Sequence, residues 1–170
     1  LLTVPLLFPF YGHALVQRPR SSPADTATYA SGGLKITVAY SRPYKKGRVI
    51  FGALVPYNEV WRTGANEPAT FTTNKELSIG GKPLPVGTYT LWTTPHADQW
   101  QVIFNKRMYK WGINMEGRAS RDAAEDALEI TVPVEVLPDV TEQFTIRVVD
   151  HKVPTLELAW DKVQVSVPLE

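Results

Sequence analysis

Residues 61–67 bring together side chains that could bind a ligand, in a chain that otherwise shows mostly β-strand patterns. The run reads Trp61-Arg62-Thr63-Gly64-Ala65-Asn66-Glu67. A guanidinium donates paired hydrogen bonds to a carboxylate or phosphate, an amide both donates and accepts, and an indole offers a flat apolar face. A buried charge or amide is costly when nothing pairs with it, so these side chains need partners.

Two interpretations of this run differ in where the partners come from. In the structural one, Arg62 and Glu67 contact each other or share a bridging group, and Asn66 bonds to neighbouring backbone, while Trp61 fills a gap in the core. In the binding one, Arg62 and Asn66 present donors to an anionic or hydroxylated ligand, with Trp61 or Trp92 as a stacking wall. The candidate ligand- or partner-binding residues are therefore Trp61, Arg62, Asn66, Glu67 and Trp92.

The residue types that usually carry catalysis or bind metal are scarce or scattered. The chain has no cysteine, and its three histidines, His13, His96 and His151, lie far apart in the sequence. That spacing does not resemble a metal site, and no motif of a serine or zinc hydrolase is present. We therefore predict no metal, no cofactor and no catalytic residue, so that the protein is not an enzyme.

The charge is balanced overall but uneven along the chain. A formal net charge of +1 gives no reason to expect a nucleic-acid partner. Residues 1–60 carry 7 Lys/Arg and 2 Asp/Glu, whereas residues 121–170 carry 4 Lys/Arg and 11 Asp/Glu. The asymmetry indicates either a charged docking face or a mixed surface in which these parts interleave.

From Leu34 onward the sequence alternates between apolar and polar residues, with turn signals between short segments. This pattern predicts an all-β fold, a single two-layer antiparallel β-sandwich of the jelly-roll or immunoglobulin-like kind with eight or nine strands. Residues 108–127 alternate less clearly and could hold a helical turn. Gly64 is expected to supply a backbone conformation that other residues avoid. The expected core contains Ile36, Val38, Leu91, Phe104, Ile130, Val132, Phe144, Ile146 and Leu158.

An apolar segment precedes this pattern. Residues 1–33 are expected to form an extended arm and linker, and residues 34–170 the sandwich domain. The first twelve residues, with two prolines, are too short for a membrane-spanning helix, at ~18 Å against a ~30 Å hydrocarbon core. The end of the run also resembles a secretory signal. We expect the arm to bind a partner protein, with possible contact between residues 1–12 and a lipid surface, through Leu6, Leu7, Phe8, Phe10 and Tyr11.

The central part of the chain resembles an uncharacterised group of secreted bacterial proteins, domain-of-unknown-function family 2911. The resemblance rests on the Trp61–Glu67 run and on four flanking groups of residues: 41–43 with 47–48, 51–57, 84–91 and 100–105. It covers about residues 34–112, and Pro68 stands where such proteins usually carry a small residue. The resemblance implies secretion and a β-rich domain. It implies no activity.

Two functions follow as expectations. The first is a non-catalytic accessory or structural subunit in the periplasm or another extracytoplasmic compartment. Its arm would attach it to the protein subunits of a membrane-associated assembly for transport, secretion or electron transfer. The alternative is a soluble binding module for a small anionic or carbohydrate-like ligand at residues 61–67. The arm discriminates between them, because only the assembly subunit needs it.

Overall fold

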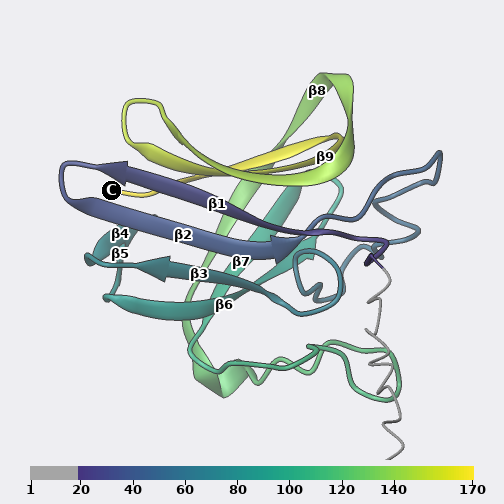
Figure 1. The fold of residues 1–170 in the computed structure, drawn as a ribbon, viewed down its shortest axis with the longest axis horizontal. Coiled ribbons are helices and arrows are strands. Elements are labelled where there is room, and N and C mark those ends of the chain that lie inside the picture. Colours follow the sequence, from purple (N-terminus) through teal and green to yellow (C-terminus); the bar gives the residue numbers. More distant parts are fainter. Residues whose placement is uncertain (1–18) are drawn as a thin grey trace, which may run out of the picture.

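The computed structural model describes residues 19–170, and strands joined by turns and loops make up most of that part (Figure 1). The predicted all-β fold is confirmed: residues 19–170 contain nine strands, one short 3-10 helix and no α-helix. The elements are β1 (Ala24–Ser31), β2 (Leu34–Ser41), β3 (Ala69–Thr73), β4 (Leu77–Ile79), β5 (Lys82–Leu84), β6 (Gly87–Pro95), β7 (Gln99–Asn105), η1 (Ala123–Glu125), β8 (Asp126–Asp150) and β9 (Pro154–Pro168). The helical turn expected within residues 108–127 is η1.

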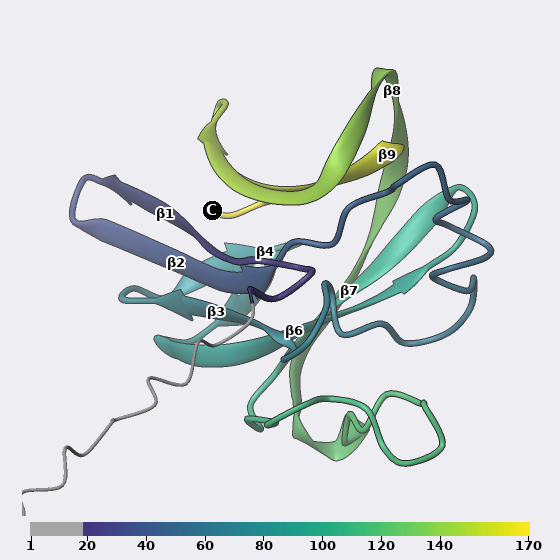
Figure 2. The same ribbon diagram turned by 45° about the vertical axis from the view of Figure 1, so that its right-hand side comes forward.

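Seven strands form one antiparallel sheet in the order β1-β2-β3-β6-β7-β8-β9, and β4 and β5 pair separately. Apart from that small hairpin, neighbours in the sheet follow chain order. This is an up-and-down arrangement, whereas jelly-roll and immunoglobulin-like sandwiches have Greek-key connections. The two layers arise because the sheet curls, so that β8 and β9 lie over β1 and β2 (Figures 1 and 2).

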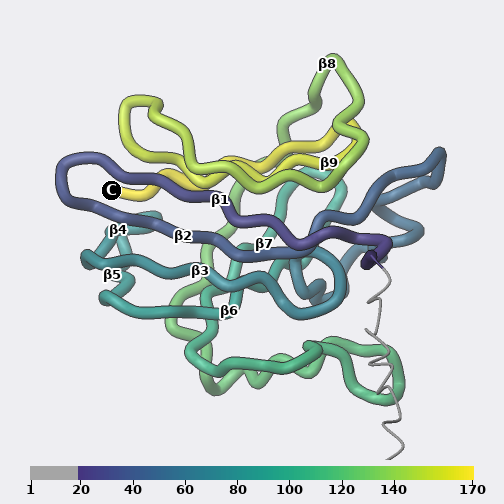
Figure 3. The backbone as a smooth tube through the Cα atoms, viewed as in Figure 1, coloured from purple at the N-terminus to yellow at the C-terminus, as the bar shows by residue number. Residues whose placement is uncertain are grey.

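The sheet curls along the long strand β8, which changes its pairing partner. Its first part pairs with β7 up to Pro133, and from Val134 it pairs with β9. Pro133 thus lies where β8 exchanges one partner for the other, a place that tolerates a residue without an N–H group. The tube in Figure 3 shows the chain rising along β8 and turning back over the other layer.

Polar contacts join the two layers at their open side. The Tyr29 hydroxyl lies 2.6 Å from a carboxylate oxygen of Asp150, and the Tyr40 hydroxyl accepts a hydrogen bond from the Ile146 N–H at 2.9 Å. Arg42 donates to the Thr145 hydroxyl at 2.8 Å. These contacts hold the second half of β8 against β1 and β2, and the apolar core fills the space between.

The predicted core residues face this interior. Eight of the nine are buried, and Ile130 is half-buried and packs against the same cluster. Around them lies an aromatic group that includes Trp100 and Trp160, both almost fully buried. Period-2 alternation located these residues because one face of each strand points inward.

The predicted boundary at Leu34 is wrong for part of the linker. Residues 24–31, expected to connect arm and domain, form the edge strand β1 and pair with β2 in register from Ala24↔Ser41 to Ser31↔Leu34. Ala27 and Tyr29 pack against the core cluster from this strand. The expected arm residues Leu6, Leu7, Phe8, Phe10 and Tyr11 lie outside the described residues.

Candidate functional site

The segment Trp61–Glu67 follows a long loop after β2 and is held on β6 by a short bridge. The Trp61 N–H donates to the Thr93 carbonyl at 2.7 Å, and the Thr93 N–H donates back at 3.0 Å. Gly64 has φ of 142°, and a Cβ there would lie 2.8 Å from the Ser41 carbonyl oxygen. The sequence-based expectation for Gly64 is confirmed: the segment passes so close to β2 that only glycine fits.

Trp61 forms the link between the core and a surface cleft. Its ring stacks on Trp160, with centroids 6.1 Å apart and planes at 18°, and meets Trp100 and Phe144 edge to face. Its indole N–H donates to the Gly64 carbonyl at 3.0 Å. The ring is only half-buried. Trp61 therefore fills the core, as the structural interpretation requires, and also lines the cleft.

Arg62 does not contact Glu67 as predicted. Its guanidinium donates to the Trp111 carbonyl at 3.1 Å and lies 5.3 Å from the centroid of the Trp111 ring. No carboxylate of residues 19–170 lies within 4.0 Å of it. Partial burial lowers the pKa of this guanidinium, and the more distant charge of Glu67 opposes that shift. Its positive charge faces the cleft without a close counter-ion.

Asn66 and Glu67 hold the chain just before β1. The Asn66 amide donates to the Ser22 carbonyl at 3.1 Å, and Glu67 forms an ion pair with Arg20 at 2.6 Å. This hydrogen bond from Arg20 is the main reason that the pKa of the Glu67 carboxyl lies below its usual value. Neither Asn66 nor Glu67 lines the cleft. Their contacts favour a structural role.

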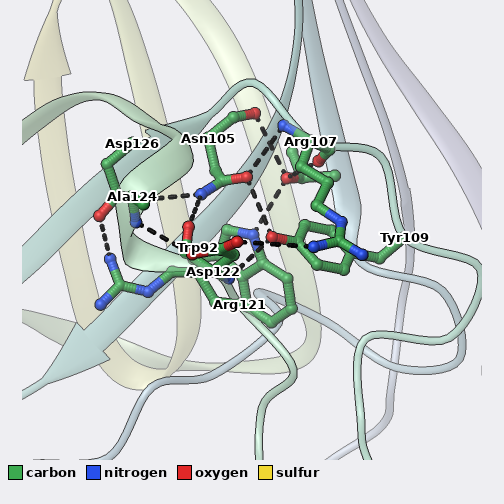
Figure 4. A network of polar contacts seen from close by, with 9 residues as sticks. Trp92, Asn105, Arg107, Tyr109, Arg121, Asp122, Ala124 and Asp126 are labelled. Carbon is green, nitrogen blue, oxygen red and sulfur yellow. Dashed lines mark hydrogen bonds and ion pairs between the residues drawn. The ribbon is translucent and has the colours of Figure 1, made fainter.

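Trp92 is fully buried and cannot act as the stacking wall of a surface site. Its indole N–H donates to the Thr90 hydroxyl at 3.0 Å, and its ring meets Tyr109 edge to face. It belongs to a polar cluster at the end of β7 (Figure 4). Of the five candidate residues, only Trp61 and Arg62 therefore face the cleft.

The cleft has a volume of about 930 Å³ and lies between two loops at one end of the sheet. One wall comes from residues 43–65, which include Trp61, and the other from residues 112–119, while Ser21, Ser22 and Trp160 complete the lining. Both loops extend from the same side of the strands (Figures 1 and 2). Its charged lining consists of four cations and one carboxylate: Lys46, Arg48, Arg62, Arg118 and Glu59.

The cations on the first wall are held largely by groups that leave their charge in place. Arg48 donates from Nε to the Lys45 carbonyl at 3.0 Å and also donates to the Tyr44 carbonyl. Lys46 Nζ lies 5.9 Å from the centroid of the Tyr44 ring. Lys45, by contrast, is paired with Asp161 at 2.8 Å. A carbonyl or a ring orients a cation but does not neutralise it, so this wall stays positive.

The second wall is anchored through Asn105, a buried side chain at the end of β7 (Figure 4). Its amide nitrogen donates to the Asp122 carbonyl and to the Asp126 carboxylate, both at 2.8 Å. Its oxygen accepts from the Arg107 N–H at 3.0 Å and from the Tyr109 hydroxyl at 3.2 Å. All the hydrogen-bonding capacity of this amide is used within the protein. The cluster therefore fixes both ends of the loop between β7 and β8, which forms the second wall of the cleft.

The sequence offered only partial signals for this site. Residues 45–48 contain three cations and a glycine, which is readable from the sequence, but their position in the same cleft as Trp61 depends on tertiary packing. The contribution of residues 112–119 was missed. Arg62 reaches the Trp111 carbonyl across 49 positions of sequence, and no local pattern encodes that contact.

Acidic and histidine side chains do not gather into a metal site here. Residues 19–170 contain no group of three or more histidine, aspartate or glutamate side chains that could hold a metal ion. His96 lies against Asn58 at 2.6 Å, and His151 against Glu157 at 3.0 Å. Within the same residues, no helix has the length and apolar character needed to cross a membrane.

Comparison with known proteins places the chain in a family. Residues 22–169 match the family model described as "Protein of unknown function (DUF2911)". The protein belongs to this family, and the match runs well beyond the central segment in which the resemblance was noticed. No curated protein and no solved structure matches the chain.

Proposed function

We propose that this protein is a binding module for a small anionic ligand, held in the cleft beside Trp61 and Arg62. One observation carries the proposal: the cleft is lined by four cationic side chains and a single carboxylate. A cleft lined by one sign of charge, with apolar walls, concentrates ligands of the opposite sign. We infer an electrostatic preference for anions.

Arg62 is the residue we expect to contact the ligand. It is half-buried, and its close partners are a backbone carbonyl and an aromatic ring. A guanidinium has five N–H donors in a planar fork, and one hydrogen bond to a carbonyl leaves most of them free. A carboxylate or phosphate could accept two of them side by side.

The remaining lining limits the ligand class further. Apolar residues such as Leu54, Val55 and Ile113 share the cleft with the cations, and Trp61 exposes part of its ring. The volume of about 930 Å³ lies within the range of about 300–1,000 Å³ that small-molecule sites occupy. A sugar acid or a sugar phosphate fits a site of this size that combines cations with an exposed indole. Hydroxyl-rich rings stack on an indole, and the acidic group pairs with arginine.

Titration calorimetry with paired sugars tests this proposal. Glucuronate and glucose 6-phosphate are expected to bind, whereas glucose should bind far more weakly because it lacks the charge. Arg62→Ala should weaken the binding of both anions by about tenfold to a hundredfold, the value of a charge-assisted hydrogen bond. Arg62→Lys should recover only part of it, because lysine cannot form the paired bonds. Lys152→Ala, on the exposed β8–β9 turn, is the matched control and should bind as the unaltered protein does.

Stability measurements separate the binding role of Arg62 from a structural one. Arg62→Ala removes one hydrogen bond to a carbonyl and one contact with a ring, so we expect a loss of about 1 kcal/mol in the free energy of unfolding. A loss of about 3 kcal/mol or more would indicate that the residue holds the fold. Equal binding of both sugar anions by Arg62→Ala and the unaltered protein would refute the proposal.

The accessory-subunit hypothesis rests on residues 1–18, which lie outside the described part. Attachment through the arm, an extracytoplasmic location and the partner subunits therefore stay predictions. Pull-down in gentle detergent from the native source, with the full chain and a chain lacking residues 1–19, tests them. The shortened chain keeps Arg20, the partner of Glu67, and the whole of β1. Recovery of the same partners by both chains would contradict attachment through the arm.

A further inference from the structure

The loop between β7 and β8 carries exposed apolar side chains and positive charge together. Among its residues 106–118, Met108 and Trp111 are 49% and 51% exposed, and Met115 is fully exposed at 105%. The same residues include four cations and one carboxylate: Lys106, Arg107, Lys110, Arg118 and Glu116. We propose that this loop docks the protein onto an anionic lipid surface, with Met115 and Trp111 entering the interface and the lysines meeting the headgroups.

Hydrogen bonds within the loop fix its backbone and leave these side chains exposed to water. The side-chain oxygen of Asn114 accepts hydrogen bonds from the N–H groups of Glu116 and Arg118, at 3.0 and 2.9 Å, and Ile113 pairs with Ala119. Met115 thus lies at the tip of an organised turn. A large apolar side chain in that position gains nothing from folding, because it buries no surface in the protein. Its contribution comes only when something else covers it.

The loop also has the reach that a surface contact requires. It stands clear of the strands, below them in Figure 1 and at the bottom of Figure 2. Asn105 and its partners fix both ends (Figure 4). An anchored loop can enter a lipid interface without first being ordered, which lowers the entropic cost of binding.

Charge decides which surface fits best. Among residues 19–170, Lys106 and Lys110 have no carboxylate within 4.0 Å, while Arg107 and Arg118 lie 3.5 and 3.9 Å from carboxylates. Lysine and arginine near a bilayer are attracted by anionic lipids, and tryptophan favours the headgroup region. An acidic protein would satisfy the cations but offers no reason for a fully exposed methionine at the tip. The combination favours a bilayer.

Vesicle sedimentation tests the proposal directly. The full chain should sediment with vesicles of phosphatidylglycerol and phosphatidylcholine, and only weakly with phosphatidylcholine alone. Met115→Ser should lower the partition coefficient by about tenfold, the value of burying one such side chain. Lys110→Glu should lower it by about twentyfold to thirtyfold, because two units of charge are lost at the surface.

Matched variants elsewhere control for exposure and charge. Val86→Ser removes an exposed apolar side chain between β5 and β6, and Lys152→Glu reverses a lysine on the β8–β9 turn, on the opposite side of the molecule in Figure 1. Neither should change sedimentation. Brominated lipids should quench the fluorescence of Trp111 in particular, since Trp92, Trp100 and Trp160 are buried and Trp61 is half-buried at the cleft. The quenching should fall sharply in Trp111→Phe.

Three results would overturn the proposal. The first is no sedimentation with phosphatidylglycerol vesicles, and the second is equal sedimentation of Met115→Ser and the unaltered protein. The third is binding of poly-glutamate through Lys110 with no vesicle binding, which would mark the loop as a site for an acidic protein. Lys110 and Met115, the two positions changed for the sedimentation test, do not line the cleft. The sedimentation outcome is therefore independent of the sugar-anion titration.

Discussion

Two polar clusters contact the loop between β7 and β8, the one around Asn105 at both ends of the loop and the one around Arg62 at Trp111. They satisfy their polar groups in opposite ways. Around Asn105, every donor and acceptor of a buried amide finds a partner within the protein, and Arg121 and Asp126 form an ion pair. Around Arg62, the partners are a carbonyl and a ring, and the positive charge remains. The charge or hydrogen-bonding groups that the partners leave unsatisfied therefore distinguish a polar cluster that can bind a ligand from one that only supports the fold.

The largest expected effect breaks the satisfied cluster. Asn105→Ala removes four hydrogen bonds from a buried position and leaves their partners unpaired, so we expect a loss of about 3 kcal/mol or more in the free energy of unfolding. Urea denaturation measures it. Asn114→Ala is the matched control, because the side-chain oxygen of this exposed asparagine likewise accepts two hydrogen bonds, here both from backbone N–H groups, and the change should cost only about 1 kcal/mol. Equal losses in the two variants would show that the Asn105 cluster has no special weight.

A somewhat smaller loss of stability is expected in the segment that carries Arg62, when Gly64 is replaced. Alanine there would need a strained backbone angle and would bring its Cβ within 2.8 Å of the Ser41 carbonyl oxygen. We expect a loss of about 2–3 kcal/mol, together with weaker binding of glucose 6-phosphate, because Arg62 would shift. Gly81→Ala also places alanine at a positive φ, 73° against 142° at Gly64, but its Cβ would have nothing within 4 Å. Gly81→Ala should therefore lose less free energy of unfolding, the part due to the positive φ alone. Its binding of glucose 6-phosphate should be unchanged.

The smallest expected effect concerns the carboxylate beside the site. The hydrogen bond from Arg20 lowers the pKa of Glu67 in the folded protein. The ionised carboxylate therefore stabilises the fold above its unfolded pKa, and this stabilisation is lost as the pH falls through the folded pKa. The gain is small because water screens a half-exposed pair. The free energies of unfolding of Glu67→Gln and the unaltered protein should differ at pH 6. The difference should shrink as the pH falls below the unfolded pKa of glutamate, about 4.3, and through the lower folded pKa. A difference that does not change with pH would contradict this account.

The sequence predicted the strands better than their arrangement. Alternation identified Ile36, Phe104 and Leu158 as core residues because a strand buries every second side chain. It missed β1, whose small and polar residues suit an edge strand with one neighbour. It could not show that one sheet curls over itself, because pairing between distant strands leaves no local trace.

The residues of the site could be predicted from the sequence, but their partners could not, because those partners are also distant in the sequence. The run from Trp61 to Glu67 stood out by composition, yet Arg62 and Glu67 turned to different partners, Trp111 and Arg20. Both partners lie more than 40 positions away. Charge type and unusual glycine usage are readable locally. Which cation ends without a counter-ion depends on the fold.

Because β8 pairs first with β7 and then with β9, the sheet can be completed only late in the synthesis of the chain. The central residues of β7, Val102 to Phe104, are apolar and buried, and β8, which covers the second edge of β7, is synthesised some twenty residues later. Until then Val102, Ile103 and Phe104 sit in an unpaired edge of the kind that joins neighbouring chains into aggregates. β8 is in turn completed only by β9, close to the C-terminus. Chains that stop before β8 should therefore aggregate through that edge.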